Sequence, residues 1–244
     1  MDRQTRKVLK SDKFAEEVFD IFEWTTEHKT QVLRYGGMVL AVAVIGLLWM
    51  FYSRHQAGIR QDELAKALRI DDASFGPSDQ GGRMHFDTEE AKNKAREQAF
   101  ADVAARFGGS QEGAIAEIYL AGWTVDKGDL AGAEKRFKRV VDDAPKGYAA
   151  LAKMALAQVY ASEGKPADAE KLLRELIASP ASTVSKEQAT IVLGQVLASS
   201  KPDEARKLLD PLRTSARIAV SRAAINAAGS IAGGASGTPG TAKP

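Results

Sequence analysis

The sequence predicts an all-α protein in which a single N-terminal transmembrane helix is followed by an α-solenoid of about three to four helix pairs. Three observations support this fold class. The stretch from Tyr35 to Tyr52 contains no charged residue. The rest of the sequence is rich in alanine and in charged residues and has few β-branched runs, which favours helices. Past the apolar stretch, a pattern of small and apolar residues recurs every 36 residues.

Residues 1–34 are expected to form a tail that contains an amphipathic helix. Apolar side chains recur there at the spacing of one helical face. The members of that face are Phe14, Val18, Ile21, Phe22 and Thr25. Acidic and basic residues are balanced across the tail, so two interpretations fit equally well: docking on a partner protein and lying on a membrane surface.

Residues 35–53 are the predicted transmembrane helix. As a helix, the uncharged stretch rises about 27 Å, close to the roughly 30 Å thickness of the hydrocarbon core. Arg34 and Arg54 bracket it, and both side chains are long enough to reach the headgroups. The apolar run begins too deep in the chain for a typical signal peptide, and no small-residue cleavage motif follows it. We therefore expect an uncleaved anchor rather than a cleaved signal or a buried core helix.

Two charge counts bear on the orientation of this anchor, and they conflict. The short tail carries seven basic residues, which favour a cytoplasmic N-terminus. They are Arg3, Arg6, Lys7, Lys10, Lys13, Lys29 and Arg34. The residues closest to the membrane lean the other way, because four basic residues follow the anchor at Arg54, Arg60, Lys66 and Arg69. Long domains translocate largely regardless of charge, so the short tail is the better guide and the repeat domain is expected on the far side.

Residues 54–228 are expected to form the repeat domain, and their spacing indicates paired helices. Ala133, Ala169 and Ala205 are evenly spaced, and each is followed four residues later by Phe or Leu. A small residue early in a second helix lets it approach the first helix closely, and the larger residue fills the space beside it. Gly128 and Gly164 supply the turn between the two helices. One pair cannot bury its apolar face alone, so pairs stack on one another.

The pattern resembles the tetratricopeptide repeat, a helix pair with a period of 34 residues. The matching residues of two successive units are Gly128, Asp129, Ala133, Phe137 and Pro145, followed by Leu156, Ala157, Tyr160, Gly164 and Ala169. The third unit departs from the pattern, because Leu193 stands at a small position and Ser200-Lys201-Pro202 replaces the glycine turn. The resemblance implies a solenoid in which the first helix of each pair lines a binding groove.

Less regular segments flank these units. A first pair is expected to consist of a helix over about Gln56–Ile70 and a second over Thr88–Phe107. Between them, Asp71–Asp87 is rich in Gly, Asp and Ser and is predicted to be a loop. A last helix over about Thr214–Ala228 is expected to cap the stack, and residues 229–244 are of low complexity and are expected to be disordered.

The order of tail, anchor and divergent repeats resembles the YfgM-like proteins, ancillary subunits of the bacterial Sec translocon. This resemblance implies a single-pass protein of the bacterial inner membrane with a cytoplasmic N-terminus and a periplasmic repeat domain. It further implies Sec translocon subunits and a periplasmic chaperone as partners. A self-associating membrane organiser in cytochrome or envelope biogenesis is the alternative function.

The sequence offers no pattern for catalysis or cofactor binding. There is no cysteine, which excludes disulfides and thiolate chemistry. His28, His55 and His85 are scattered, and no phosphate-binding loop, nucleophile elbow or metalloprotease motif occurs. The net charge of +2 is nearly balanced, so no nucleic-acid surface is expected. We expect a protein that is not an enzyme and that takes no cofactor, metal ion, nucleic acid or small-molecule substrate.

A partner-binding groove is predicted from the positions that match the groove-lining places of the repeat. These are Ile118, Gly122, Leu151, Met154, Gln158, Ser162, Thr190 and Gly194. The surface they would form is mostly apolar with some polar groups, which suits an extended segment of another protein. Some of them could equally be packing residues between repeats.

Overall fold

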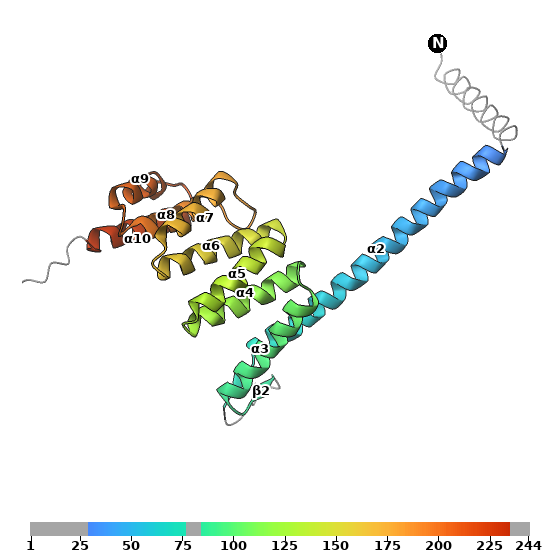
Figure 1. Cartoon of the computed structure of the whole chain (residues 1–244), viewed down its shortest axis with the longest axis horizontal. Helices are drawn as coiled ribbons and strands as arrows, with labels where there is room; N and C mark the ends of the chain where they lie inside the picture. The colour runs from blue at the N-terminus through green and yellow to red at the C-terminus, as the bar shows by residue number, and fades with distance from the viewer. Residues whose placement is uncertain (1–28, 77–83, 235–244) are drawn as a thin grey trace, which may run out of the picture. The chain divides into compact units, whose positions relative to one another are not determined.

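A computed structural model of the chain describes residues 29–76 and 84–234. Within those residues the chain forms nine helices and one two-stranded sheet (Figure 1). The predicted amphipathic helix of the tail and residues 235–244 lie outside the described residues. The chain divides into two compact units, Met1–Ile59 and Arg60–Pro244, which are described separately.

The described part of the first unit is the N-terminal portion of helix α2, which spans Lys29–Asp71. Every described side chain from Arg34 to His55 is exposed, including Trp49 at 72 %. Helix α2 is long and apolar enough to cross a membrane. The side chains of its apolar stretch are exposed, unlike those of a core helix, whereas Leu64 and Ala67 near its C-terminal end are buried in a core cluster of the second unit.

The second unit is an α-solenoid of helix pairs, as the sequence predicts. Its helices are α3 (Glu89–Arg106), α4 (Gln111–Asp126), α5 (Leu130–Asp143), α6 (Lys146–Ser162), α7 (Pro166–Ala178), α8 (Lys186–Leu197), α9 (Pro202–Arg213) and α10 (Ile218–Gly234). From α3 to α9 each helix packs on the next, and the first helix α6 also contacts the first helices on either side of it, α4 and α8 (Figure 1). Helix α10 closes the stack by packing on both α8 and α9.

The evenly spaced alanines form the centre of the packing. Ala133, Ala169 and Ala205 are each 0 % exposed. The larger residues four positions later are buried in the same clusters: Phe137 beside Ala133, and Leu173 and Leu209 beside the other two. The small alanine thus allows the two helices to approach, and the Phe or Leu four positions later fills the space between them. This part of the sequence prediction is confirmed.

Short polar residues and glycines set the helix boundaries. Thr88, Ser110 and Asp129 precede α3, α4 and α5, and each side chain accepts a hydrogen bond from a backbone N–H in the first turn. Gly128 and Gly164 follow the first helices of their pairs with φ of +81° and +74°, a backbone conformation that favours glycine. The two glycines therefore make the turns that the sequence predicts.

The structure differs from the sequence prediction at two places. Strands β1 (Ser74–Phe75) and β2 (His85–Phe86) pair in parallel within the segment predicted to be a loop. Helix α10 continues to Gly234, although the sequence predicts that the ordered domain ends at Ala228. Ile231 is 4 % exposed and belongs to the last core cluster, so one buried apolar residue extends the helix into glycine-rich sequence.

Candidate functional site

A hollow opens between α3 and α5, with α4 as its floor. Its inner part is a cavity of about 240 Å³ lined mainly by alanine and glycine, among them Ala101, Ala105 and Gly113. A wider outer part of about 710 Å³ shares Ala101, Leu120, Arg136 and Arg139 with it. The two parts form one hollow, which we call the α4 hollow. It lies on the side of the solenoid where the second helices stand.

A buried carboxylate lies at the bottom of the α4 hollow. Glu117 of α4 is 5 % exposed. Its Oε1 atom accepts a hydrogen bond from Arg136 at 3.1 Å and another from Arg139 at 2.9 Å, both from α5. Two guanidinium groups therefore share one acceptor atom, and this pairing offsets the cost of burying the charge.

Two glycines near Glu117 determine how closely α4 approaches the end of α3. A Cβ atom at Gly113 would fall on the backbone carbonyl of Phe107, so only glycine lets α4 approach the end of α3 this closely. Gly109 has a φ of +77° and makes the turn between the two helices. The sequence shows Gly108-Gly109 as a helix end, but it gives no sign that these glycines line a cavity.

A second buried carboxylate on α4 pairs with an arginine of helix α2. Glu112 is 6 % exposed, and its Oε2 atom accepts a hydrogen bond from Arg60 at 3.2 Å. Charged residues on a mostly buried helix are uncommon unless they are paired. The one signal in the sequence for both glutamates is their position among the apolar residues of α4, and that signal does not identify their partners.

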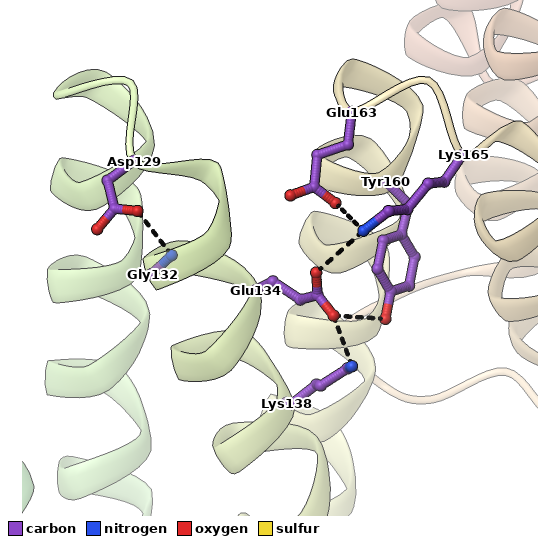
Figure 2. Close-up of polar contacts among 7 residues, drawn as sticks. All are labelled: Asp129, Gly132, Glu134, Lys138, Tyr160, Glu163 and Lys165. Atoms are coloured by element: carbon purple, nitrogen blue, oxygen red, sulfur yellow. Dashed lines mark hydrogen bonds and ion pairs between the residues drawn. The ribbon is translucent and has the colours of Figure 1, made fainter.

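A polar bridge ties the second helices together (Figure 2). Glu134 of α5 accepts hydrogen bonds from Lys138 at 2.6 Å and from the Tyr160 hydroxyl at 3.3 Å. Lys165, which precedes α7, pairs with Glu134 at 3.4 Å and with Glu163 at 2.8 Å. The hydrogen bond from Lys138 is the largest cause that holds the pKa of the Glu134 carboxyl below its usual range.

The same bridge recurs one repeat later. Glu170 of α7 pairs with Lys201, which precedes α9, at 2.9 Å and with Arg174 at 2.7 Å. The hydrogen bond from Lys201 is the largest cause that lowers the pKa of Glu170. Each bridge joins the second helix of one pair to the start of the second helix of the next, so these contacts strengthen the junctions between repeats.

None of the eight predicted groove residues lines the α4 hollow. Gln158 and Ser162 are exposed on α6; Ile118, Gly122, Leu151 and Met154 are half-buried, and Thr190 and Gly194 are buried. Leu151 and Met154 pack against the last core cluster. A Cβ atom at Gly194 would lie 2.7 Å from the Leu209 side chain, so this glycine allows α8 to approach α9. Gln158 and Ser162 are thus the two fully exposed members of the set.

In the described part of the chain, no group of three or more His, Asp and Glu side chains could hold a metal ion. The charged residues of the α4 hollow are paired across helices, and they accompany a cavity lined by small side chains. Such an arrangement can bind a peptide or another side chain.

A family model described as a tetratricopeptide repeat-like domain matches residues 29–207. The chain belongs to the tetratricopeptide repeat-like family. The family match begins at the start of α2, extends through the first two regular helix pairs and ends within α9, the second helix of the third pair. No curated protein matches the chain, and no solved structure does.

Membership of the tetratricopeptide repeat-like family indicates a scaffold for protein–protein interaction, and this fold is typical of non-catalytic domains. The α4 hollow lies wholly within the matched residues. Helix α10 lies beyond them, consistent with a role in closing the stack.

Proposed function

We propose that this protein is a non-catalytic, membrane-anchored scaffold whose tetratricopeptide repeat-like domain binds other proteins. One observation carries the proposal: a single family match spans both the exposed apolar stretch of α2 and the helix pairs. An uncovered apolar stretch of this length is unstable in water and suits a hydrocarbon environment. The scaffold therefore acts at a membrane surface.

We further propose that the membrane is the bacterial inner membrane, with the N-terminus in the cytoplasm and the repeat domain in the periplasm. The basic tail supports this orientation. The resemblance to the YfgM-like proteins supports the partners, which are Sec translocon subunits and a periplasmic chaperone. In this role the scaffold holds a chaperone close to the point where chains leave the translocon.

The absence of cysteine allows a clean test of the orientation. A single cysteine replaces Ser11 in the tail in one variant and Ser162 on α6 in another. The outer membrane of the cells is permeabilised while the inner membrane is left intact, and a membrane-impermeant maleimide is then added. The proposal predicts labelling of the Ser162→Cys variant and protection of the Ser11→Cys variant. The reverse pattern would place the repeat domain in the cytoplasm.

Partner binding is tested by site-specific photocrosslinking in cells. A photoreactive residue replaces Gln158, which is exposed on the first helix α6, and in a matched control it replaces Lys171, which is exposed on the second helix α7. We expect crosslinks to a translocon subunit or a periplasmic chaperone from position 158 and none from position 171. Crosslinks only between copies of this chain would support the membrane organiser instead.

The structure also improves the choice of disrupting variant. Met154 packs against the core, so a charged residue there would destabilise the domain and obscure a loss of binding. Gln158→Glu and Ser162→Glu change exposed positions alone. We expect the double variant to lose its crosslinked partners while its thermal unfolding stays unchanged.

A further inference from the structure

The α4 hollow contains more hydrogen-bond donors than the chain itself uses. A guanidinium group has five N–H donors, and for Arg136 and Arg139 the one shared acceptor in the hollow is a single oxygen of Glu117. The side chain of Arg139 is 59 % exposed and that of Arg136 is 34 % exposed. Both arginines line both parts of the hollow, so their remaining donors are accessible from it.

Further positive charge lines the outer part of the hollow. Lys94 of α3 and Lys135 of α5 both face it, and neither forms an ion pair with another described residue. The two carboxylates in the same outer lining are already engaged: Glu97 pairs with Lys127, and Asp129 accepts the backbone N–H of Gly132. The outer hollow therefore presents a surplus of cations that the surrounding residues do not neutralise.

The inner part of the hollow has a different character. Its lining is mainly alanine and glycine and leaves a cavity of about 240 Å³ beside the two arginines; its two carboxylates are Glu117, which the arginines bind, and Asp143. Small apolar walls next to a cluster of cationic donors match a ligand with an aliphatic group adjacent to an anionic one. Arginine binds a carboxylate through two parallel N–H···O bonds, which fixes the orientation of the bound group.

We propose that the α4 hollow is a second protein-binding site, which takes an extended segment of a partner protein that carries an aspartate or glutamate side chain next to an aliphatic residue. The carboxylate pairs with the free donors of Arg139 and Arg136, and the aliphatic side chain enters the cavity between α3 and α5. Lys94 and Lys135 attract the acidic segment over a longer range.

This site differs from the predicted groove, whose residues lie elsewhere on the first helices. It rests on the proposed function only in that its ligand is a protein segment. A scaffold that binds all partners through Gln158 and Ser162 would leave the α4 hollow empty. The two ideas can therefore fail independently.

The test uses the full chain in detergent micelles and a fluorescent peptide, acetyl-Gly-Leu-Glu-Leu-Gly-amide, with fluorescence anisotropy as the readout. A matched peptide has Gln in place of Glu. We expect the Glu peptide to bind at least about tenfold more tightly than the Gln peptide, the effect of one charge-assisted pair, and to lose affinity as salt is raised.

Two variants locate the binding. Arg139→Gln removes the more exposed guanidinium while Arg136 still pairs with Glu117, and it should weaken the Glu peptide about tenfold. Ala105→Trp fills the hollow from an exposed position on α3 and should block both peptides. The control is Glu175→Gln, which removes a charge from the corresponding hollow over α6 and should leave the affinity within about twofold.

Thermal unfolding of each variant separates loss of binding from loss of fold. Because Ala105→Trp and Arg139→Gln disturb different parts of the hollow, loss of binding by either folded variant supports the proposal. Equal binding of the Glu and Gln peptides, or full affinity in both folded variants, would overturn it.

Discussion

The hollows over α4 and α6 occupy the same place in successive repeats, yet their charges are reversed. Glu117 of α4 corresponds to Lys153 of α6, and Arg139 of α5 corresponds to Glu175 of α7. Each pair joins the first helix of a repeat to its second helix, at 2.9 Å for Glu117–Arg139 and 3.1 Å for Lys153–Glu175. The repeat thus preserves an ion pair at this place while the signs of its two charges change.

The two hollows also differ in how their charges are balanced. At α4 the second arginine, Arg136, joins the pair, whereas the corresponding residue in the next repeat is Leu172, which packs against the core. Lys153 has one carboxylate partner, and its side chain is 30 % exposed. The charged lining of the α6 hollow consists of Lys146, Lys153 and Glu175. The α4 hollow instead combines a buried carboxylate shared by two arginines with two lysines, Lys94 and Lys135, in its outer lining. The comparison teaches that the ion pair between the two helices recurs in both repeats, whereas the additional arginine and its free donors occur at α4 alone of these two hollows.

The largest expected effect concerns the floors of the two hollows. Gly113 corresponds to Ala149 in the next repeat, but a Cβ atom at position 113 would fall on the Phe107 carbonyl. We expect Gly113→Ala to lower the free energy of unfolding by about 3 kcal/mol through overpacking. Ala149→Gly should lower it by about 1 kcal/mol through helix propensity alone. Urea unfolding of both variants checks this difference; equal effects would show that the backbone at α4 adapts.

The next effect concerns the buried carboxylate. Replacing both Arg136 and Arg139 with alanine leaves Glu117 buried without its partners, and we expect a loss of about 2 kcal/mol, because part of the hollow admits water. Lys153→Ala should cost less than about 1 kcal/mol, since its partner Glu175 is exposed. A further Glu117→Gln substitution should restore most of the stability of the double variant. If it does not, packing by the arginine side chains matters more than charge.

A smaller effect concerns acid stability. The pKa values of Glu134 and Glu170 are lowered in the folded chain, so their pairing stabilises the fold above their ordinary pKa of 4.5. That stabilisation is lost as pH falls through the lower folded pKa values. Glu134→Gln with Glu170→Gln should therefore reduce stability at pH 7 and flatten its decline below about pH 4.5. Thermal unfolding from pH 7 to pH 3 measures the slope, and a decline as steep as that of the parent chain would assign acid sensitivity to other carboxylates.

The helix pairs could be predicted from the sequence because their signals are local. The spacing of Ala133, Ala169 and Ala205 and the glycines after the first helices specify which residues meet within a pair. The end of α10 could not be predicted as well, because the low-complexity composition after Ala228 indicated a disordered tail, whereas Ile231 is buried in the last core cluster. Propensity is a weak guide where a single tertiary contact decides the boundary.

The α4 hollow could not be predicted, since it depends on the relative placement of three helices. Glu117, Arg136 and Arg139 come from two helices, and the third contributes small residues to the inner part and Lys94 to the outer part. Once the fold is known, alignment of the repeats shows that the charge changes sign at this position, with Glu117 in one repeat and Lys153 in the next. The position of Gly194 beside Leu209 is another case, because a glycine matched to a groove position served helix packing instead.

The most direct test of this account gives the α4 hollow the charges of the α6 hollow. The triple variant carries Glu117→Lys, Arg136→Leu and Arg139→Glu, which keeps an ion pair and removes the surplus donors. We expect the variant to unfold within roughly 5 °C of the parent chain, to keep its crosslinks from position 158, and to lose the Glu peptide. A folded triple variant that binds the Glu peptide as tightly as the parent chain would contradict the central claim.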